Sequence, residues 1–83
     1  MTTEAIKQKI IEAIYEIAPE HEGEQLDETA NIQRSLEIDS FDFLNLLTAL
    51  NEALGVEVPE SDYGKVDTIE HMAEYFAEHM AQK

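Results

Sequence analysis

Three stretches of this chain repeat apolar residues at the spacing of an amphipathic helix, and this pattern constrains the fold more than any other feature. The most apolar stripe follows i, i+3, i+4, i+7 and i+11: Phe43, Leu46, Leu47, Leu50 and Leu54. Comparable stripes precede and follow it: Ile6, Ile10, Ile14 and Ile17, then Ile69, Met72, Ala73, Phe76 and Met80. Strand-like alternation is limited to two valines, which is too short for a sheet. The sequence therefore predicts an all-α fold.

Helix start and stop signals stand at the ends of the first and last stripes. A threonine at position 2 or 3 can cap the first helix, and Pro19 ends it, which predicts a helix over about residues 3–18. Asp67 and Thr68 precede the last stripe, so we expect the last helix to start there.

The central helix has signals at both ends. Asp39 or Ser40 supplies the N-cap, and Asp42 forms a near capping box with Asp39. Gly55 stands where a helix commonly ends in a left-handed residue. We expect this helix to run from about Ser40 to Leu54.

Two connecting segments complete the predicted architecture. Pro59 can open a short helical turn over Glu60–Tyr63. The segment from Pro19 to Ile38 is predicted to be a long loop that four apolar residues pin onto the helices: Leu26, Ile32, Leu36 and Ile38. The expected fold is a four-helix bundle of three main helices and one short helix, with a long first loop.

The charge of the chain narrows the choice of partner. Nineteen acidic residues against five Lys and Arg give a net charge of −14. This balance argues against binding to nucleic acid, which needs cationic contacts to phosphate, and against docking on anionic membranes. It favours a protein partner with a basic surface, since opposite fields steer association.

The chain of 83 residues is long enough for one domain, spanning residues 1–83, and too short for a second core. It has no cysteine, which excludes a disulfide framework and a thiolate site. No apolar run has the length of a membrane span, and the N-terminus lacks the features of a signal peptide. We expect a cytoplasmic monomer.

The usual signatures of catalysis and metal binding are missing. Ser40 is not in a Gly-x-Ser-x-Gly elbow, and the three glycines do not form a phosphate loop. EF-hand registers starting at Asp27 or Asp39 lack the required glycine and glutamate. His71 and His79 lie two turns apart on the last helix, which fits solvated polar positions better than half a metal site. We predict neither an enzyme nor a metal centre.

Ser40 remains as the candidate site. Its ordinary role would be helix capping, together with Asp39. A serine at a helix start after a long loop is also expected to be exposed, and a phosphate ester there would lie at the positive end of the helix dipole. From Ser35 to Gly64 the chain has seven acidic residues and no Lys or Arg, which makes a plausible surface for a basic partner.

With these residues in view, the chain resembles the acyl carrier proteins over nearly its full length. Asp39-Ser40-Phe41 is similar to the Asp-Ser-Leu attachment signature of that family at the start of its second helix. The stretch Phe43–Leu50 resembles the rest of that helix, Leu54–Pro59 the following turn, and Val66–Ile69 the start of the last helix.

The resemblance implies a non-enzymatic carrier. Ser40 would receive a 4′-phosphopantetheine arm from coenzyme A through a phosphopantetheinyl transferase, and the arm would hold an acyl group as a thioester. Partner synthases or acyl/AMP ligases would dock their basic patches on a set of residues around the second helix: Asp39, Phe41, Asp42 and Glu52. Four residues would line the acyl pocket: Leu46, Leu50, Val58 and Tyr63.

The chain departs from the family pattern in ways that suggest a specialised role. Phe41 replaces the usual leucine, Glu37 stands where glycine is common, and Asn45 and Asn51 replace acids. These changes favour a carrier in a specialised fatty acid, lipid or polyketide pathway over the housekeeping carrier. Two alternatives stay open: an aminoacyl or peptidyl carrier loaded by an adenylating ligase, and an acidic helical adapter in which Ser40 is only a cap.

Overall fold

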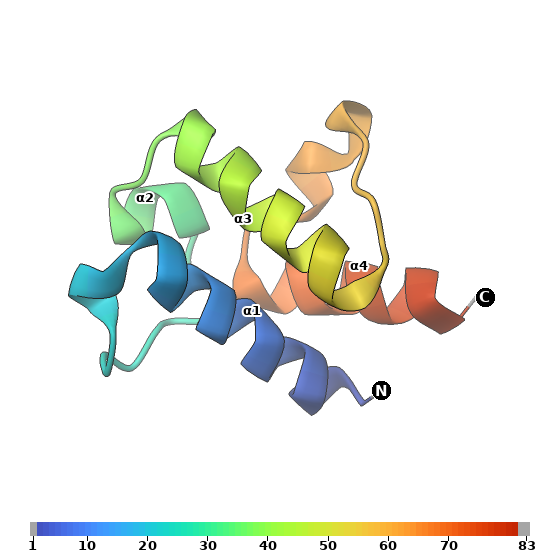
Figure 1. The fold of residues 1–83 in the computed structure, drawn as a ribbon, viewed down its shortest axis with the longest axis horizontal. Helices are drawn as coiled ribbons and strands as arrows, with labels where there is room; N and C mark the ends of the chain where they lie inside the picture. Colours follow the sequence, from blue (N-terminus) through green and yellow to red (C-terminus); the bar gives the residue numbers. More distant parts are fainter. Residues whose placement is uncertain (1, 82–83) are drawn as a thin grey trace.

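The computed structural model describes residues 2–81, which form a small helical bundle (Figure 1). Its elements follow in the order α1 (Thr3–Ile17), η1 (Pro19–His21), α2 (Ile32–Leu36), α3 (Ser40–Leu54), η2 (Glu60–Lys65) and α4 (Ile69–Ala81). No strand occurs between residues 2 and 81; one antiparallel bridge joins Asn31 to Thr68. The predicted all-α class is confirmed. No helix within these residues has both the length and the apolar character needed to cross a membrane.

The caps predicted from the sequence set the ends of the long helices. The Thr2 hydroxyl accepts a hydrogen bond from the backbone N–H of Ala5 at 3.1 Å and starts α1. The helix ends at Ile17, one residue before the predicted end, because Ala18 already leaves helical geometry ahead of Pro19. At the start of α4, the Thr68 hydroxyl accepts a hydrogen bond from His71 N–H at 3.0 Å.

Helix α3 has the predicted bounds. The carboxylate of Asp39 accepts a hydrogen bond from the N–H of Asp42 at 2.9 Å, so Asp39 is the N-cap and Ser40 is the first helical residue. Gly55 ends the helix in the left-handed region with φ of 72°, which glycine adopts without steric cost.

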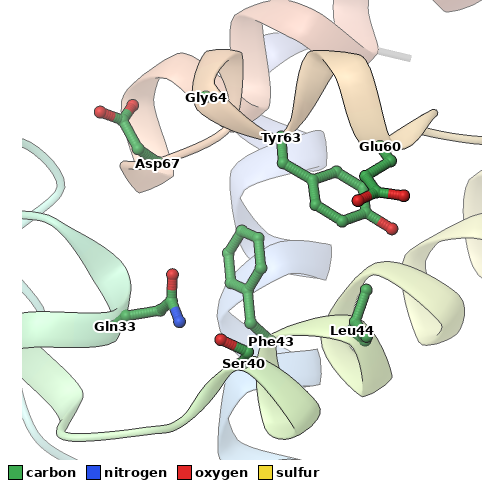
Figure 2. A pocket seen from close by; sticks show the side chains of 8 residues that line it. All are labelled: Gln33, Ser40, Phe43, Leu44, Glu60, Tyr63, Gly64 and Asp67. Atoms are coloured by element: carbon green, nitrogen blue, oxygen red, sulfur yellow. The ribbon is translucent and has the colours of Figure 1, made fainter.

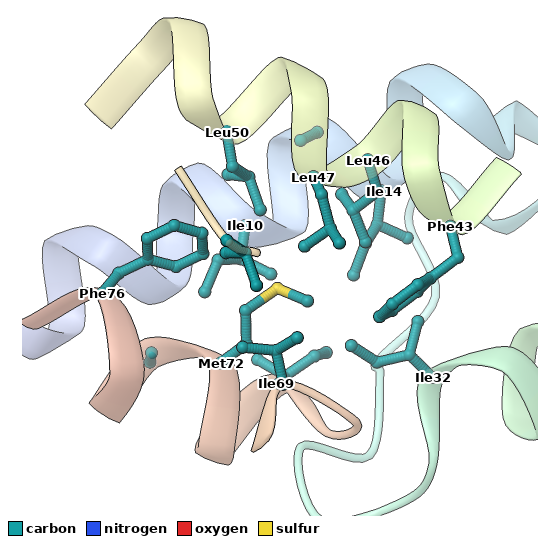
Figure 3. Packing of buried hydrophobic residues seen from close by; sticks show 14 of the residues in the cluster. Ile10, Ile14, Ile32, Phe43, Leu46, Leu47, Leu50, Ile69, Met72 and Phe76 are labelled. Carbon is teal, nitrogen blue, oxygen red and sulfur yellow. The ribbon is translucent and has the colours of Figure 1, made fainter. Parts of the chain in front are cut away.

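The core lies where the apolar stripes of the three long helices meet (Figure 3). Helix α1 packs against both α3 and α4. The residues with the largest fully buried side chains include Ile6, Ile10, Ile14, Leu46, Leu50, Ile69, Met72 and Phe76. Burial of these stripes is the main source of stability, since a single amphipathic helix of this length is marginal in water.

The segment predicted as a loop over residues 19–38 contains two helical elements, η1 and the five-residue α2. The pinning was predicted correctly: Ile32, Leu36 and Ile38 are buried, and Leu26 packs against the core in a partly buried position. Helix α2 was missed because five residues do not display a helical period. Its formation depends on tertiary contacts, among them a 2.8 Å hydrogen bond from Ile32 N–H to the carbonyl of Asp67.

His21 connects the two ends of the segment 19–38 through its side-chain hydrogen bonds. Nε2 of His21 lies 3.1 Å from the carbonyl oxygen of Leu36, and Nδ1 lies 3.1 Å from a carboxylate oxygen of Glu24. Both partners are acceptors, so the protonated ring satisfies both of them. Glu37 then closes α2 in the left-handed region with φ of 55°, and the chain turns toward Asp39.

The predicted short turn at Glu60–Tyr63 is part of η2, which continues to Lys65. Its position over the end of the bundle is set by Tyr75 of α4, whose hydroxyl donates a 2.7 Å hydrogen bond to the carboxylate of Asp62. Burial raises the pKa of Tyr75 to about 12, and the bond to Asp62 contributes. The same bond lowers the pKa of Asp62. Tyr75 and Asp62 therefore fix η2 opposite the start of α3.

Candidate functional site

Ser40 is exposed at the first position of α3. Because the first N–H groups of a helix have no partner inside it, the amides of Ser40 and Phe41 are available to an anion bound there. The Asp39 carboxylate satisfies a different amide, that of Asp42. Asp39 therefore caps α3, so the hydroxyl of Ser40 is not needed for capping and is left for other chemistry.

A cavity of about 560 Å³ opens beside Ser40 (Figure 2). It lies between α2, α3 and η2, and the residues around it are Gln33, Ser40, Phe43, Leu44, Glu60, Tyr63, Gly64 and Asp67. The rings of Phe43 and Tyr63 meet edge to face, with centroids 6.3 Å apart. Its volume is in the range of small-molecule sites, and it combines an aromatic wall with a few polar groups.

A second hollow of about 380 Å³ lies farther along α3 and shares Leu44 and Tyr63 with the first. The predicted acyl-pocket residues divide between these hollows and the core. Tyr63 lines both hollows and Val58 lines the second. Leu46 is fully buried and lines neither, and Leu50 is fully buried beside a separate small depression between α1 and α3.

The predicted docking residues surround the outer side of α3. Phe41 is 70% exposed beside Ser40, Asp39 and Glu52 are exposed, and Asp42 is partly buried. At 3.6 residues per turn, Phe41 and Glu52 lie on one side of the helix about three turns apart, while Asp42 lies about 100° around it from Phe41. The four residues thus surround the helix start and extend along one side, and do not form one compact cluster.

Several residues of this site were not predicted from the sequence. Leu44 is 41% exposed and lines both hollows. Its position off the buried stripe of α3 was a signal that could have found it. Gln33 and Asp67 carried no such signal, because they reach the cavity only through the placement of α2 and of the start of α4. The carboxylate of Asp67 lies 2.8 Å from Nδ1 of His71, and this hydrogen bond raises the pKa of His71.

Comparison with known proteins assigns the family. A family profile described as a phosphopantetheine attachment site matches residues 6–76. An acyl carrier protein of Rubrobacter xylanophilus is 33% identical over 76 residues, covering 88% of this chain and 94% of that protein. The acyl carrier protein of Lactobacillus johnsonii is 33% identical, covering 95% and 98%, and that of Zymomonas mobilis is 36% identical, covering 84% and 94%. The chain belongs to the acyl carrier protein family.

Family membership fits the chemistry of the site. Proteins of this family are carriers and not enzymes, and they hold a covalent phosphopantetheine group. An exposed hydroxyl at a helix N-terminus is suited to bear a phosphate ester, since the helix dipole and free amides favour negative charge there. The adjoining cavity leaves room for an attached group to lie against the protein. As an acyl carrier protein, the chain works with phosphopantetheinyl transferases and synthase enzymes in general.

Proposed function

We propose that Ser40 is the attachment residue and that the chain presents acyl groups to successive enzymes from an arm esterified to its hydroxyl. The observation that carries this assignment is the exposure of Ser40 at the start of α3, at the mouth of the 560 Å³ cavity. When bound, the phosphopantetheine group supplies a terminal thiol that holds the cargo as a thioester.

Different residues around Ser40 would contact different parts of the phosphopantetheine group. The N-terminal amides of α3 and its dipole stabilise the phosphate charge. The aromatic wall of Phe43 and Tyr63 offers apolar contact to the arm or the cargo. Val58 and Tyr63 remain proposed wall residues for the acyl chain. Leu46 and Leu50 belong to the packed core, so an acyl chain reaches them only when the helices separate.

The outer side of α3 is the proposed docking surface. Asp39, Asp42 and Glu52 supply negative charge, which steers a partner that has a basic patch. Phe41 and Leu44 add exposed apolar area beside this charge. Such a surface fits a phosphopantetheinyl transferase, and a synthase or acyl/AMP ligase, that combines cationic side chains with an apolar recess.

We also propose the kind of metabolic pathway in which this carrier works. The departures at Phe41, Glu37, Asn45 and Asn51 favour a specialised fatty acid, lipid or polyketide pathway. The relatives described above bear the name acyl carrier protein, which supports an acyl cargo over an aminoacyl one.

The test is intact mass after incubation with coenzyme A and a broad-specificity phosphopantetheinyl transferase. We expect wild type to gain one phosphopantetheine and Ser40→Ala to gain none. Ser35→Ala and Ser61→Ala are matched controls, because both serines are exposed and lie outside α3, and both variants should be modified like wild type. A folded wild type that gains no mass, or a modified Ser40→Ala, would refute the assignment.

A further inference from the structure

We infer that Gln33 is a positioning residue that holds the amide groups of the phosphopantetheine arm in the cavity beside Ser40. This inference rests on the proposed attachment at Ser40. It assigns a role to a residue that lies seven positions before the attachment serine and outside α3.

The placement of Gln33 is set by α2. Its backbone carbonyl accepts a 3.1 Å hydrogen bond from Ile38 N–H, which closes the C-terminal end of α2. Its neighbour Ile32 is 1% exposed and anchors the helix in the core. The side chain of Gln33 is partly buried, and its carboxamide is directed into the cavity near Ser40 and Phe43 (Figure 2). Among residues 2–81 this carboxamide has no hydrogen-bond partner.

The other polar groups around the cavity are less suited to bind an amide near Ser40. The Asp67 carboxylate is engaged by His71 at 2.8 Å and is directed away from Phe43 in Figure 2. Glu60 is exposed, and its carboxylate only accepts hydrogen bonds. The Tyr63 hydroxyl is directed away from Ser40, toward Glu60. Apart from Ser40, whose hydroxyl is esterified once the arm is attached, Gln33 alone among the lining residues has a side chain that offers both donor and acceptor on the Ser40 side.

The chemistry of the arm matches this side chain. The pantetheine moiety has two secondary amides, each with one N–H and one C=O group. An amide that leaves water without finding a partner is unfavourable, so the cavity retains the arm only where a protein group replaces the lost hydrogen bonds. A carboxamide is complementary to an amide in both directions, since it donates through N–H and accepts through C=O.

The first experiment compares the apo and holo forms of the uniformly ¹⁵N-labelled protein. The side-chain signal of Gln33 is identified as the pair of NH₂ resonances that disappears from the spectrum of the Gln33→Glu variant. We expect conversion to the holo form to shift this signal several times more than those of Gln8 and Gln25, which are exposed and lie outside the cavity. Equal shifts for Gln33, Gln8 and Gln25 would overturn the inference.

The second experiment measures hydrogen exchange of the arm amides in holo protein. We expect Gln33→Leu to accelerate exchange several-fold toward the rate of free pantetheine, Gln33→Glu to fall between, and the control Gln25→Leu to match wild type. Intact mass verifies modification of each variant, and amide spectra verify its fold. Unchanged exchange in a modified, folded Gln33→Leu refutes the role of Gln33 while the attachment stands, whereas absence of modification in wild type refutes the attachment itself.

Discussion

Leu44 and Leu46 are a matched pair on α3 whose burial predicts opposite responses to truncation. Leu46 is 0% exposed in the core, where α3 packs against α1 (Figure 3). Leu44 is 41% exposed and lines the two hollows. Leu46→Ala removes the same atoms as Leu44→Ala. Only the Leu46 variant leaves a void between packed helices, because a close-packed core relaxes incompletely.

The expected losses of folding stability differ widely between the two variants. Truncation of a fully buried leucine costs about 3 kcal/mol, the sum of lost transfer free energy and the cavity that remains. The total stability of a domain of 83 residues is about 4–12 kcal/mol at typical values per residue. Leu46→Ala should therefore remove a large share of the stability, while Leu44→Ala should change it by less than about 0.5 kcal/mol.

The assay is urea denaturation followed by far-UV circular dichroism on the apo protein. With a slope of about 1 kcal/mol per M for a small domain, the Leu46→Ala midpoint should fall by about 3 M and the Leu44→Ala midpoint should stay within about 0.5 M of wild type. A loss below about 1 kcal/mol for Leu46→Ala, or equal losses for the two variants, would show that Leu46 is not a core residue and would return it to the acyl-pocket set.

Three further predictions concern backbone conformation, protonation and charge. Glu37 and Gly55 both adopt positive φ, which glycine tolerates better than any other residue. In urea denaturation, Glu37→Gly should therefore raise the free energy of unfolding by about 0.5–1 kcal/mol, and Gly55→Ala should lower it by about 1 kcal/mol. A change of the same sign in both variants would contradict the argument. Partial burial lowers the pKa of His21, but the hydrogen bonds to the Leu36 carbonyl and Glu24 carboxylate outweigh it, so the net pKa is raised. Because the folded-state pKa is higher than the unfolded one, the stability from His21 is fully present below about pH 6.5 and is lost as pH rises through the folded pKa. The stability difference between wild type and His21→Gln should shrink over that window, and a difference that grows with pH would be inconsistent with it. Finally, a net charge of −14 predicts that the melting temperature rises from dilute buffer to physiological salt, and a melting temperature independent of salt would exclude self-repulsion as the weak point.

Local signals were sufficient for the long helices. The stripes of α1, α3 and α4 identify their buried faces, and the caps at Thr2, Asp39, Gly55 and Thr68 act within a few residues of the helix ends. These hydrogen bonds and turns depend on near neighbours in the chain, so the sequence displays them directly. The exposure of Ser40 follows from the same local reasoning.

Helix α2 could not be predicted in this way. Its five residues are held by buried Ile32 and Leu36 and by a backbone hydrogen bond to Asp67, which is 35 positions farther along the chain. A helix this short is unstable without such contacts, and its sequence contains too few turns to show a period. For that reason the sequence predicted a long loop over this region and missed the short helix within it.

The sequence by itself determined the all-α class, the three long helices, the acidic character and the serine at the start of α3. Each of these is a property of composition or of residues close together in the chain. Only the tertiary structure decided which residues line the cavity: Leu46, predicted for the acyl pocket, is buried in the core, while Leu44 and Tyr63 line the hollows. It also brought Gln33 to the side of Ser40, because the backbone hydrogen bond from Ile32 to Asp67, just before α4, joins segments whose proximity no local pattern encodes.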